Sequence, residues 1–235
     1  MKKIQLKQVL RNKRFVLFTI ILPIGWYIFF DQLQKGISPS ILLGIAVFIG
    51  VIGNSLATFS KRIASDIGFY SFESHFTSYS VKNYLWDQSI VQLILNSLIF
   101  LAVLVVAVLG FHFPVTTSLL VQFFLLSLMG IYFSVIGFVL GVRVDAKTID
   151  TIGFPVIILA AMTIIPFDTL GASGGFMDLV GKLQRVFPGY YYTKLVQDLT
   201  EKQTIDVSQL ALFVAVFGLN LLFFYLLVPK GKMGN

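Results

Sequence analysis

The feature that most constrains this chain is a set of long apolar segments without an ionisable residue. Asp, Glu, Lys, Arg and His are absent from six stretches: 15–30, 40–59, 89–110, 117–141, 151–167 and 208–228. A helix that crosses a bilayer needs about 20 mostly apolar residues, with a range of about 17–25. The pattern therefore predicts an all-α integral membrane protein, in which residues 1–235 form one domain with six transmembrane helices.

Composition and charge support the same class. The mean hydropathy is +0.87 and only 12% of the residues are charged, against about 25% in soluble domains. Cysteine is absent, which excludes disulfides and cysteine-based metal sites or nucleophiles. The formal net charge of +7 fits a protein that lies against anionic lipid, and we expect no nucleic-acid partner.

The distribution of Lys and Arg predicts the orientation. If the N-terminus is cytoplasmic, thirteen of the 18 Lys and Arg residues fall on the cytoplasmic side and five on the outer side. Basic residues accumulate in cytoplasmic loops, so we expect both termini inside the cell. Leu6, Val9 and Leu10 share one helical face, which predicts an interfacial helix over 1–14. An ordinary basic flank is the alternative.

The chargeless spans also limit the function. Ion-coupled carriers place ionisable groups at membrane depth, and the six spans contain none. His75 and His112 fall on opposite sides of the predicted membrane, so they do not form one catalytic site. We therefore expect no enzymatic activity, cofactor or metal site in this chain.

Small and polar residues inside the spans indicate how the helices pack. Gly137 and Gly141 form a G-x-x-x-G motif, which allows close helix packing. Uncharged polar residues fit interhelical hydrogen bonds or a weakly polar path for cargo: Asn54, Ser55, Thr58, Gln92, Asn96, Ser97, Thr163 and Asn220.

Residues 168–207 are too polar to span a membrane but are strongly patterned. Apolar residues at helical spacing predict two short amphipathic helices, over 176–187 and 192–199, with a break at Pro188. The segment is expected on the outer side, either as a re-entrant or interfacial structure or as a folded cap. Two residues are candidate caps of the last span, Asp206 and Ser208.

The segment between the second and third spans, 61–87, is unusually aromatic. It reads KRIASDIGFYSFESHFTSYSVKNYLWD and contains seven aromatic residues. Aromatic anchors dominate the energetics of protein interfaces, which favours a docking surface on the cytoplasmic side. An aromatic belt at the membrane surface is the alternative.

These features together resemble the permeases of ABC-2-type exporters, the membrane subunits of bacterial ATP-driven pumps. The likeness covers nearly the whole chain, and DIGFYSFESHFTSYSVKNYL and LQRVFPGYYYTKLVQDL carry it in detail. Ser78 stands where the family usually has proline, and the family's lysine at the start of the third span is missing. The matching positions are Asp66, Gly68, Tyr70, Ser80, Tyr84, Leu85, Pro188 and Tyr190.

The resemblance implies partners and sites. Two permeases, identical or homologous, would assemble with two ABC ATP-binding subunits, which hold ATP and Mg²⁺. Segment 61–87 would dock on the ATPase through Asp66, Phe69, Tyr70, Phe72, Glu73, Phe76 and Tyr79. The second and fifth spans would line the substrate path with Phe48, Asn54, Thr58, Phe154, Met162 and Thr163.

The expected function is therefore export across the bacterial plasma membrane. The apolar path residues favour a hydrophobic or amphipathic cargo, such as a bacteriocin or lantibiotic peptide, a drug or a lipid-like molecule. The alternative is a membrane scaffold or immunity protein that transports nothing and binds a partner or a peptide.

Overall fold

The structure, a computed structural model, describes residues 7, 11, 13–33, 38–73, 76, 81–165, 167, 175–201 and 204–227. For a few of these it describes the backbone alone: Arg14, Phe15, Phe18, Leu33, Tyr70, Glu73, Val81, Lys82, Leu85 and 176–178. Most of the predicted interfacial helix over 1–14 lies outside the described residues, and so does Tyr79.

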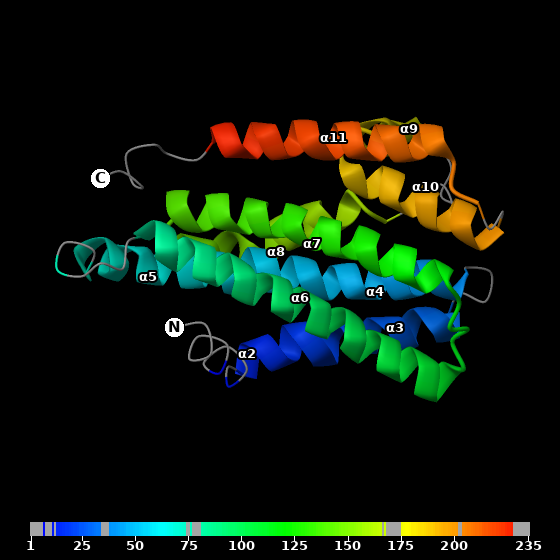
Figure 1. Ribbon diagram of the computed structural model, residues 1–235, viewed down its shortest axis with the longest axis horizontal. Coiled ribbons are helices and arrows are strands. Elements are labelled where there is room, and N and C mark those ends of the chain that lie inside the picture. Colours follow the sequence, from blue (N-terminus) through cyan, green and yellow to red (C-terminus); the bar gives the residue numbers. More distant parts are fainter. Residues whose placement is uncertain are drawn as a thin grey trace.

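Every regular element in the described part of the chain is a helix (Figure 1). Residues 13–33 form one continuous helix, made of α2 (Lys13–Val16), the π-helix η1 (Leu17–Ile21) and α3 (Leu22–Leu33). Residues 39–73 form a second, made of α4 (Pro39–Gly53), the π-helix η2 (Asn54–Phe59) and α5 (Ser60–Glu73). The other helices are α6 (Val81–Phe111), α7 (Ser118–Arg143), α8 (Ala146–Met162), α9 (Gly175–Gln184), α10 (Pro188–Glu201) and α11 (Val207–Leu226).

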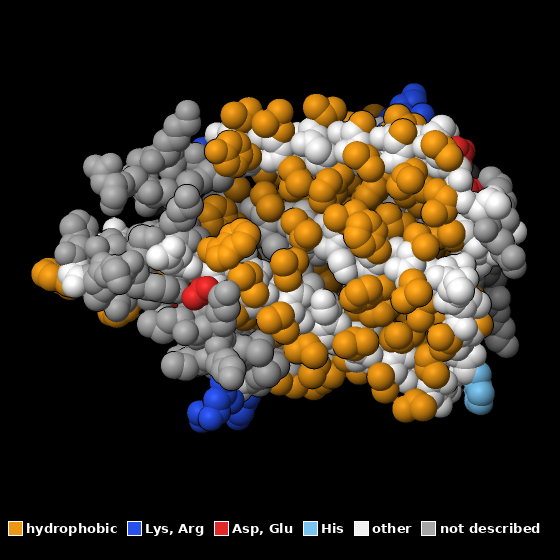
Figure 2. All heavy atoms as spheres, viewed as in Figure 1, with side chains coloured by type: hydrophobic (Ala, Val, Ile, Leu, Met, Phe, Trp, Pro, Cys, Tyr) orange, Lys and Arg blue, Asp and Glu red, His pale blue; other side chains and the backbone are white. Residues whose placement is uncertain are grey.

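Four of these helical segments are long and apolar enough to cross a membrane: Pro39–Phe69, Trp86–Phe111, Ser118–Arg143 and Val207–Leu226. They overlap the predicted second, third, fourth and sixth spans. The predicted first and fifth spans fall on the helix over 13–33 and on α8, which are not among the four. Figure 2 shows apolar side chains over most of the middle of one face, with the visible charged groups towards its two ends. The chain therefore has the character of an all-α membrane protein.

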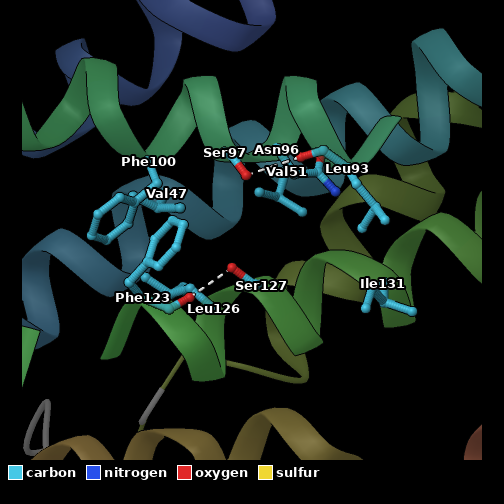
Figure 3. A pocket seen from close by; sticks show the side chains of 10 residues that line it. All are labelled: Val47, Val51, Leu93, Asn96, Ser97, Phe100, Phe123, Leu126, Ser127 and Ile131. Atoms are coloured by element: carbon cyan, nitrogen blue, oxygen red, sulfur yellow. Dashed lines mark hydrogen bonds between the residues drawn. The ribbon is translucent and has the colours of Figure 1, made fainter. Parts of the chain in front are cut away.

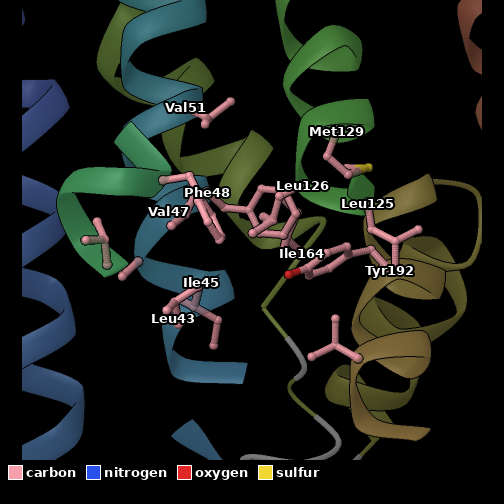
Figure 4. Close-up of a cluster of buried hydrophobic side chains, with 14 of the residues drawn as sticks. Leu43, Ile45, Val47, Phe48, Val51, Leu125, Leu126, Met129, Ile164 and Tyr192 are labelled. Carbon is pink, nitrogen blue, oxygen red and sulfur yellow. The ribbon is translucent and has the colours of Figure 1, made fainter. Parts of the chain in front are cut away.

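The helix over 39–73 lies at the centre of the bundle. In its most apolar window 83% of the residues are buried, against 6% in that of α11. It packs against α3, α6, α7 and α8. The main hydrophobic core forms around α4, where Phe48 lies among side chains from α7 and α10 (Figure 4). The second predicted span is therefore an internal helix, enclosed on most sides by protein.

The connections alternate between the two ends of the bundle (Figure 1). The start of α2, the end of α5, the start of α6, the α7–α8 junction and the end of α11 lie at one end. The α3–α4 and α6–α7 junctions lie at the other end, together with α9 and α10. The start of the first described helix, α2, and the end of the last, α11, thus lie at the end of the bundle where α5 ends and α6 begins.

The helices α9 and α10 close the end of α8. Gln184 Nε2 donates to the carbonyl oxygens of Met162 and Ile165 at 2.6 and 2.8 Å, and Thr193 Oγ1 donates to that of Ile164 at 3.2 Å. The last carbonyls of a helix have no partner within the helix. Gln184 satisfies that of Met162, the last residue of α8, and the other two bonds hold the turn that follows α8. This arrangement lets α8 end inside the bundle after 17 residues.

The two predicted amphipathic helices are present between α8 and α11. Pro188 is the first residue of α10, a position where the missing N–H costs no helical hydrogen bond. The predicted apolar stripe of α10 is buried against α4, α7 and α11, with Tyr192, Leu195, Val196 and Leu199 at 8% exposure or less. Asp206, one of the two candidate caps, accepts hydrogen bonds from the backbone N and the hydroxyl of Ser208 at 2.8 and 2.7 Å.

Candidate functional site

The structure places much of the predicted site on one uninterrupted helix. Phe48, Asn54 and Thr58, from the predicted path, lie on the helix over 39–73. Its last turns carry most of the predicted docking residues, from Asp66 to Glu73. The predicted segment 61–87 is thus largely helical, because residues 60–73 extend this helix and α6 already begins at residue 81.

Exposed aromatic side chains mark the end of this helix. Phe69, Phe72 and Phe76 are 62%, 67% and 75% exposed. The ring centroids of Phe72 and Phe76 are 5.0 Å apart. Trp86 in the first turns of α6 is 67% exposed as well, although the sequence did not single it out. The side chains of Tyr70 and Glu73, also predicted to dock, lie outside the description.

Asp66 differs from these aromatic residues because it takes part in the fold. It is half-buried, and Tyr84 donates its hydroxyl proton to Asp66 Oδ2 at 3.1 Å. Tyr84 is fully buried in a small cluster with Phe59, Ile63 and Val142. The pair therefore joins the end of α5 to the start of α6.

The link between Asp66 and Tyr84 belongs to a row of hydrogen-bonded pairs between the helix over 39–73 and α6. Asn54 Nδ2 donates to Asn96 Oδ1 at 3.4 Å. Gln92 Nε2 donates to Ser55 Oγ at 3.2 Å. We call this row of contacts the polar seam: Asn54, Ser55 and Asp66 on the helix over 39–73, and Tyr84, Gln92 and Asn96 on α6. It runs from the middle of α6 to its first turn.

A backbone carbonyl fixes how the amides of the polar seam are oriented. Asn96 Nδ2 donates to the carbonyl oxygen of Gly130 at 3.2 Å and to Ser134 Oγ at 3.3 Å. Because a carbonyl only accepts, Asn96 Oδ1 must face Asn54 Nδ2 and Gln92 Nε2, which donate to it at 3.4 and 3.2 Å. Asn54 Oδ1 and Gln92 Oε1 are consequently left buried without a donor among the described residues.

Two more groups without hydrogen-bond partners lie along the seam. Gln88 stands between Tyr84 and Gln92 on α6, and its Oε1 is buried without a donor in the described part. Arg62 on α5 has its three guanidinium nitrogens buried without an acceptor there, and its guanidinium carbon lies 5.5 Å from the centroid of the Phe59 ring. Gln88 and Arg62 lie at about the same level along the two helices, between the Asp66–Tyr84 pair and the Ser55–Gln92 pair.

The predicted close-packing motif holds α7 against the same central helix. A Cβ atom at Gly137 would overlap the carbonyl oxygen of Ser55, and one at Gly141 would lie 2.5 Å from the carbonyl oxygen of Ser60. Both contacts are with η2 or the first residue of α5. Glycine at these positions therefore allows the two backbones to approach.

The predicted path residues are not gathered around one space. Phe48 is 1% exposed, and its ring centroid lies 4.6 Å from that of Tyr192 (Figure 4). Phe154 on α8 is 72% exposed. Met162 and Thr163 are half-buried at the end of α8, next to α9 and α10. Within one chain, Phe48 and Asn54 of the second predicted span are thus enclosed and Thr58 is half-buried. Phe154 of the fifth predicted span lies on the surface.

An ion pair joins the two helices that carry these residues. Lys61 on α5 contacts the carboxylate of Asp150 on α8, and the two side chains are 32% and 48% exposed. Asp150 is the fifth residue of α8, so the pair lies close to the α7–α8 junction. It connects the second predicted span to the fifth, near the start of the aromatic segment.

Part of the polar seam has a signal in the sequence. Polar residues recur every four positions along α6, at Tyr84, Gln88, Gln92 and Asn96. Residues at this spacing lie on one side of a helix, so they form one stripe. The sequence does not predict which residues bond to this stripe. Asn54, for example, is separated from its partner Asn96 by 42 residues, so no local pattern connects them.

No protein family model matches this chain, and the comparisons with curated proteins and with solved structures also gave no match.

Proposed function

We propose that this chain is the permease subunit of an ATP-driven exporter in the bacterial plasma membrane. It would cross the membrane six times with both termini in the cytoplasm. A second permease, identical or homologous, and two ABC ATP-binding subunits would complete the transporter. ATP and Mg²⁺ would bind in the ATPase subunits, and this chain itself would catalyse nothing. The cargo would be hydrophobic or amphipathic, such as a bacteriocin or lantibiotic peptide, a drug or a lipid-like molecule.

The continuous helix over 39–73 carries the proposal. One end of it presents the exposed rings of Phe69 and Phe72, and its apolar part holds Phe48 and Asn54 in the core. A movement imposed on the exposed end would therefore reach the middle of the bundle without crossing a loop. The polar seam and the glycine contacts with α7 would pass that movement to α6 and α7.

Co-purification tests the proposal most directly. The tagged full-length chain is extracted from its own bacterial membranes in mild detergent, and proteins bound to it are identified by mass spectrometry. We expect an ABC ATP-binding subunit in a ratio near one to one. Phe72→Ala combined with Phe76→Ala should reduce the recovered ATPase about fivefold or more, since aromatic anchors dominate interfaces.

The matched control is Phe223→Ala on α11, which removes a ring that is 58% exposed but lies outside the aromatic segment. It should leave ATPase recovery unchanged. Equal recovery with the double variant would show that these rings do not dock the ATPase. If no ATPase accompanies the unmodified chain, the export proposal fails and the scaffold or immunity alternative takes its place.

A further inference from the structure

A cavity of about 310 Å³ lies between α4, α6 and α7. Figure 3 shows the rings of Phe100 and Phe123 together at one end and Leu93 and Ile131 towards the other. The two ring centroids are 4.9 Å apart. None of the six predicted path residues lines this cavity, so it is separate from the predicted substrate path.

The position of the cavity points to a ligand that comes from the membrane. Its lining from α6 is centred on the middle of that 31-residue helix. Leu93, at the rim, is 39% exposed on the surface of α6. A molecule that reaches this depth from the side must first dissolve in the apolar part of the bilayer. The volume is close to the lower limit of about 300 Å³ for small-molecule sites.

The polar groups of the cavity are able to accept hydrogen bonds but not to donate them. Ser97 and Ser127 face each other across it (Figure 3) and donate their hydroxyl protons to the carbonyls of Leu93 and Phe123, at 3.1 and 2.8 Å. Each hydroxyl retains lone pairs for a second partner. The amide of Asn96 uses both of its N–H groups on other partners.

The lining therefore defines the chemical class of the ligand. No charged residue lines the cavity, and burying an ionised group without a counter-charge is strongly unfavourable. We propose that this cavity binds an uncharged aliphatic molecule with a hydroxyl or amide N–H group, as in long-chain alcohols and fatty amides. The aliphatic chain would fill the space between the phenylalanine and leucine side chains. Its donor group would bond to Ser97 or Ser127.

Photolabelling of the purified full-length chain tests this site. The protein is placed in phosphatidylcholine nanodiscs with a long-chain alcohol that carries a diazirine in mid-chain, and labelled peptides are mapped by mass spectrometry. The fatty acid with the same diazirine serves as the comparison at pH 8. We expect saturable labelling by the alcohol near Leu93–Phe100 and Phe123–Ile131, with about fivefold less by the acid.

Two variants separate the shape of the site from its hydrogen bonding. Ser127→Phe fills the cavity and should remove the saturable labelling. Ser97→Ala with Ser127→Ala keeps the space but removes both acceptors, and should reduce labelling about fivefold, the effect of one neutral hydrogen bond. Leu222→Phe, at a residue of α11 that is 55% exposed, should change nothing at the cavity.

The proposal is overturned if the alcohol labels α11 as strongly as the cavity, or if the double alanine variant retains full labelling. Equal labelling by the alcohol and the acid would overturn the assigned ligand class. The experiment uses no ATPase, so its outcome is independent of whether the chain belongs to an exporter.

Discussion

The hydroxyl of Tyr84 donates a hydrogen bond to Asp66 at 3.1 Å and so ties the first turn of α6 to the middle of α5. Asp66 was expected to face a partner protein, yet the structure uses it within the chain. The rings of Phe69 and Phe72 in the same helix are 62% and 67% exposed. Asp66 is thus placed to hold the exposed end of the helix over 39–73 against α6.

We predict that Tyr84→Phe lowers the thermal stability of the purified protein. The change removes one hydrogen bond to a half-buried carboxylate, for which about 1.5–3 kcal/mol is typical. Thermal unfolding in detergent, followed by tryptophan fluorescence, measures the effect. Tyr225→Phe on α11, where the side chain is 70% exposed, is the control and should leave the midpoint unchanged. Equal midpoints for all three proteins would contradict a stabilising role for the Tyr84 hydroxyl.

The helix positions were largely visible in the sequence, whereas the polar contacts were not. The predicted fourth span, 117–141, became α7 over Ser118–Arg143, because long apolar runs reveal a helix without knowledge of its neighbours. The pairing of Asn54 with Asn96 depends on how two distant helices are rotated against each other, which no local pattern determines. The helix over 60–73 was also missed, since its charges and Gly68 resemble a loop.

Gly137→Ala should destabilise the protein, although alanine favours helices. The added methyl group would overlap the carbonyl oxygen of Ser55, and overpacking of this kind costs about 1–3 kcal/mol. Gly218→Ala on α11 is the matched control, because nothing lies within 4 Å of its Cβ position. There the helix preference of about 1 kcal/mol should act alone. We expect the two unfolding midpoints in detergent to move in opposite directions. A rise for both variants would disprove the close contact.

The side-chain amides of the polar seam should differ in how much each contributes to the stability of the fold. Asn96 makes four hydrogen bonds, to Asn54, Gln92, Gly130 and Ser134. Within the described part, Asn54 donates one side-chain bond to the seam. Interhelical hydrogen bonds in membranes average about 0.6 kcal/mol each, so Asn96→Ala should lower the unfolding midpoint more than Asn54→Ala. Thr151→Ala, which removes a bond within α8 only, is the control. The reverse order of the two asparagine variants would refute this account.

Asp145 should make the stability of the α7–α8 junction depend on pH. Hydrogen bonds from the hydroxyl and the backbone N–H of Thr148 lower the pKa of Asp145, which caps the start of α8. Because the folded-state pKa lies below the unfolded value of about 3.9, the carboxylate stabilises the fold above that value. This contribution is lost as the pH falls through the folded pKa. The unfolding midpoint of Asp145→Ala should therefore lie below that of the unmodified chain at pH 7.

The difference in unfolding midpoint between Asp145→Ala and the unmodified chain should shrink as the pH is lowered from 7 towards 3. Asp145→Asn is the control, because asparagine also caps helices well but does not titrate. Its midpoint should lie between those of the other two proteins at pH 7. A gap for Asp145→Ala that stays constant down to pH 3 would show that the charge of Asp145 contributes nothing.

Arg62 provides a prediction in which stability and function move in opposite directions. Its guanidinium nitrogens are buried without a hydrogen-bond acceptor among the described residues, and such burial costs free energy. Arg62→Met keeps an unbranched side chain close in length to the aliphatic stem of arginine and removes the guanidinium with its charge, so the unfolding midpoint should rise by about 2 °C or more. In the proposed exporter the same variant should reduce ATP-driven transport, if Arg62 finds its acceptor when the helix over 39–73 moves.

Lys61→Met is the matched control for the neighbouring charge. Lys61 is partly exposed and pairs with Asp150, and exposed pairs contribute about 0–1 kcal/mol. Its loss should lower the midpoint only slightly. A clear fall in the midpoint of Arg62→Met would mean that the guanidinium is already satisfied in the resting fold. A rise without any loss of transport would mean that Arg62 has no part in the movement.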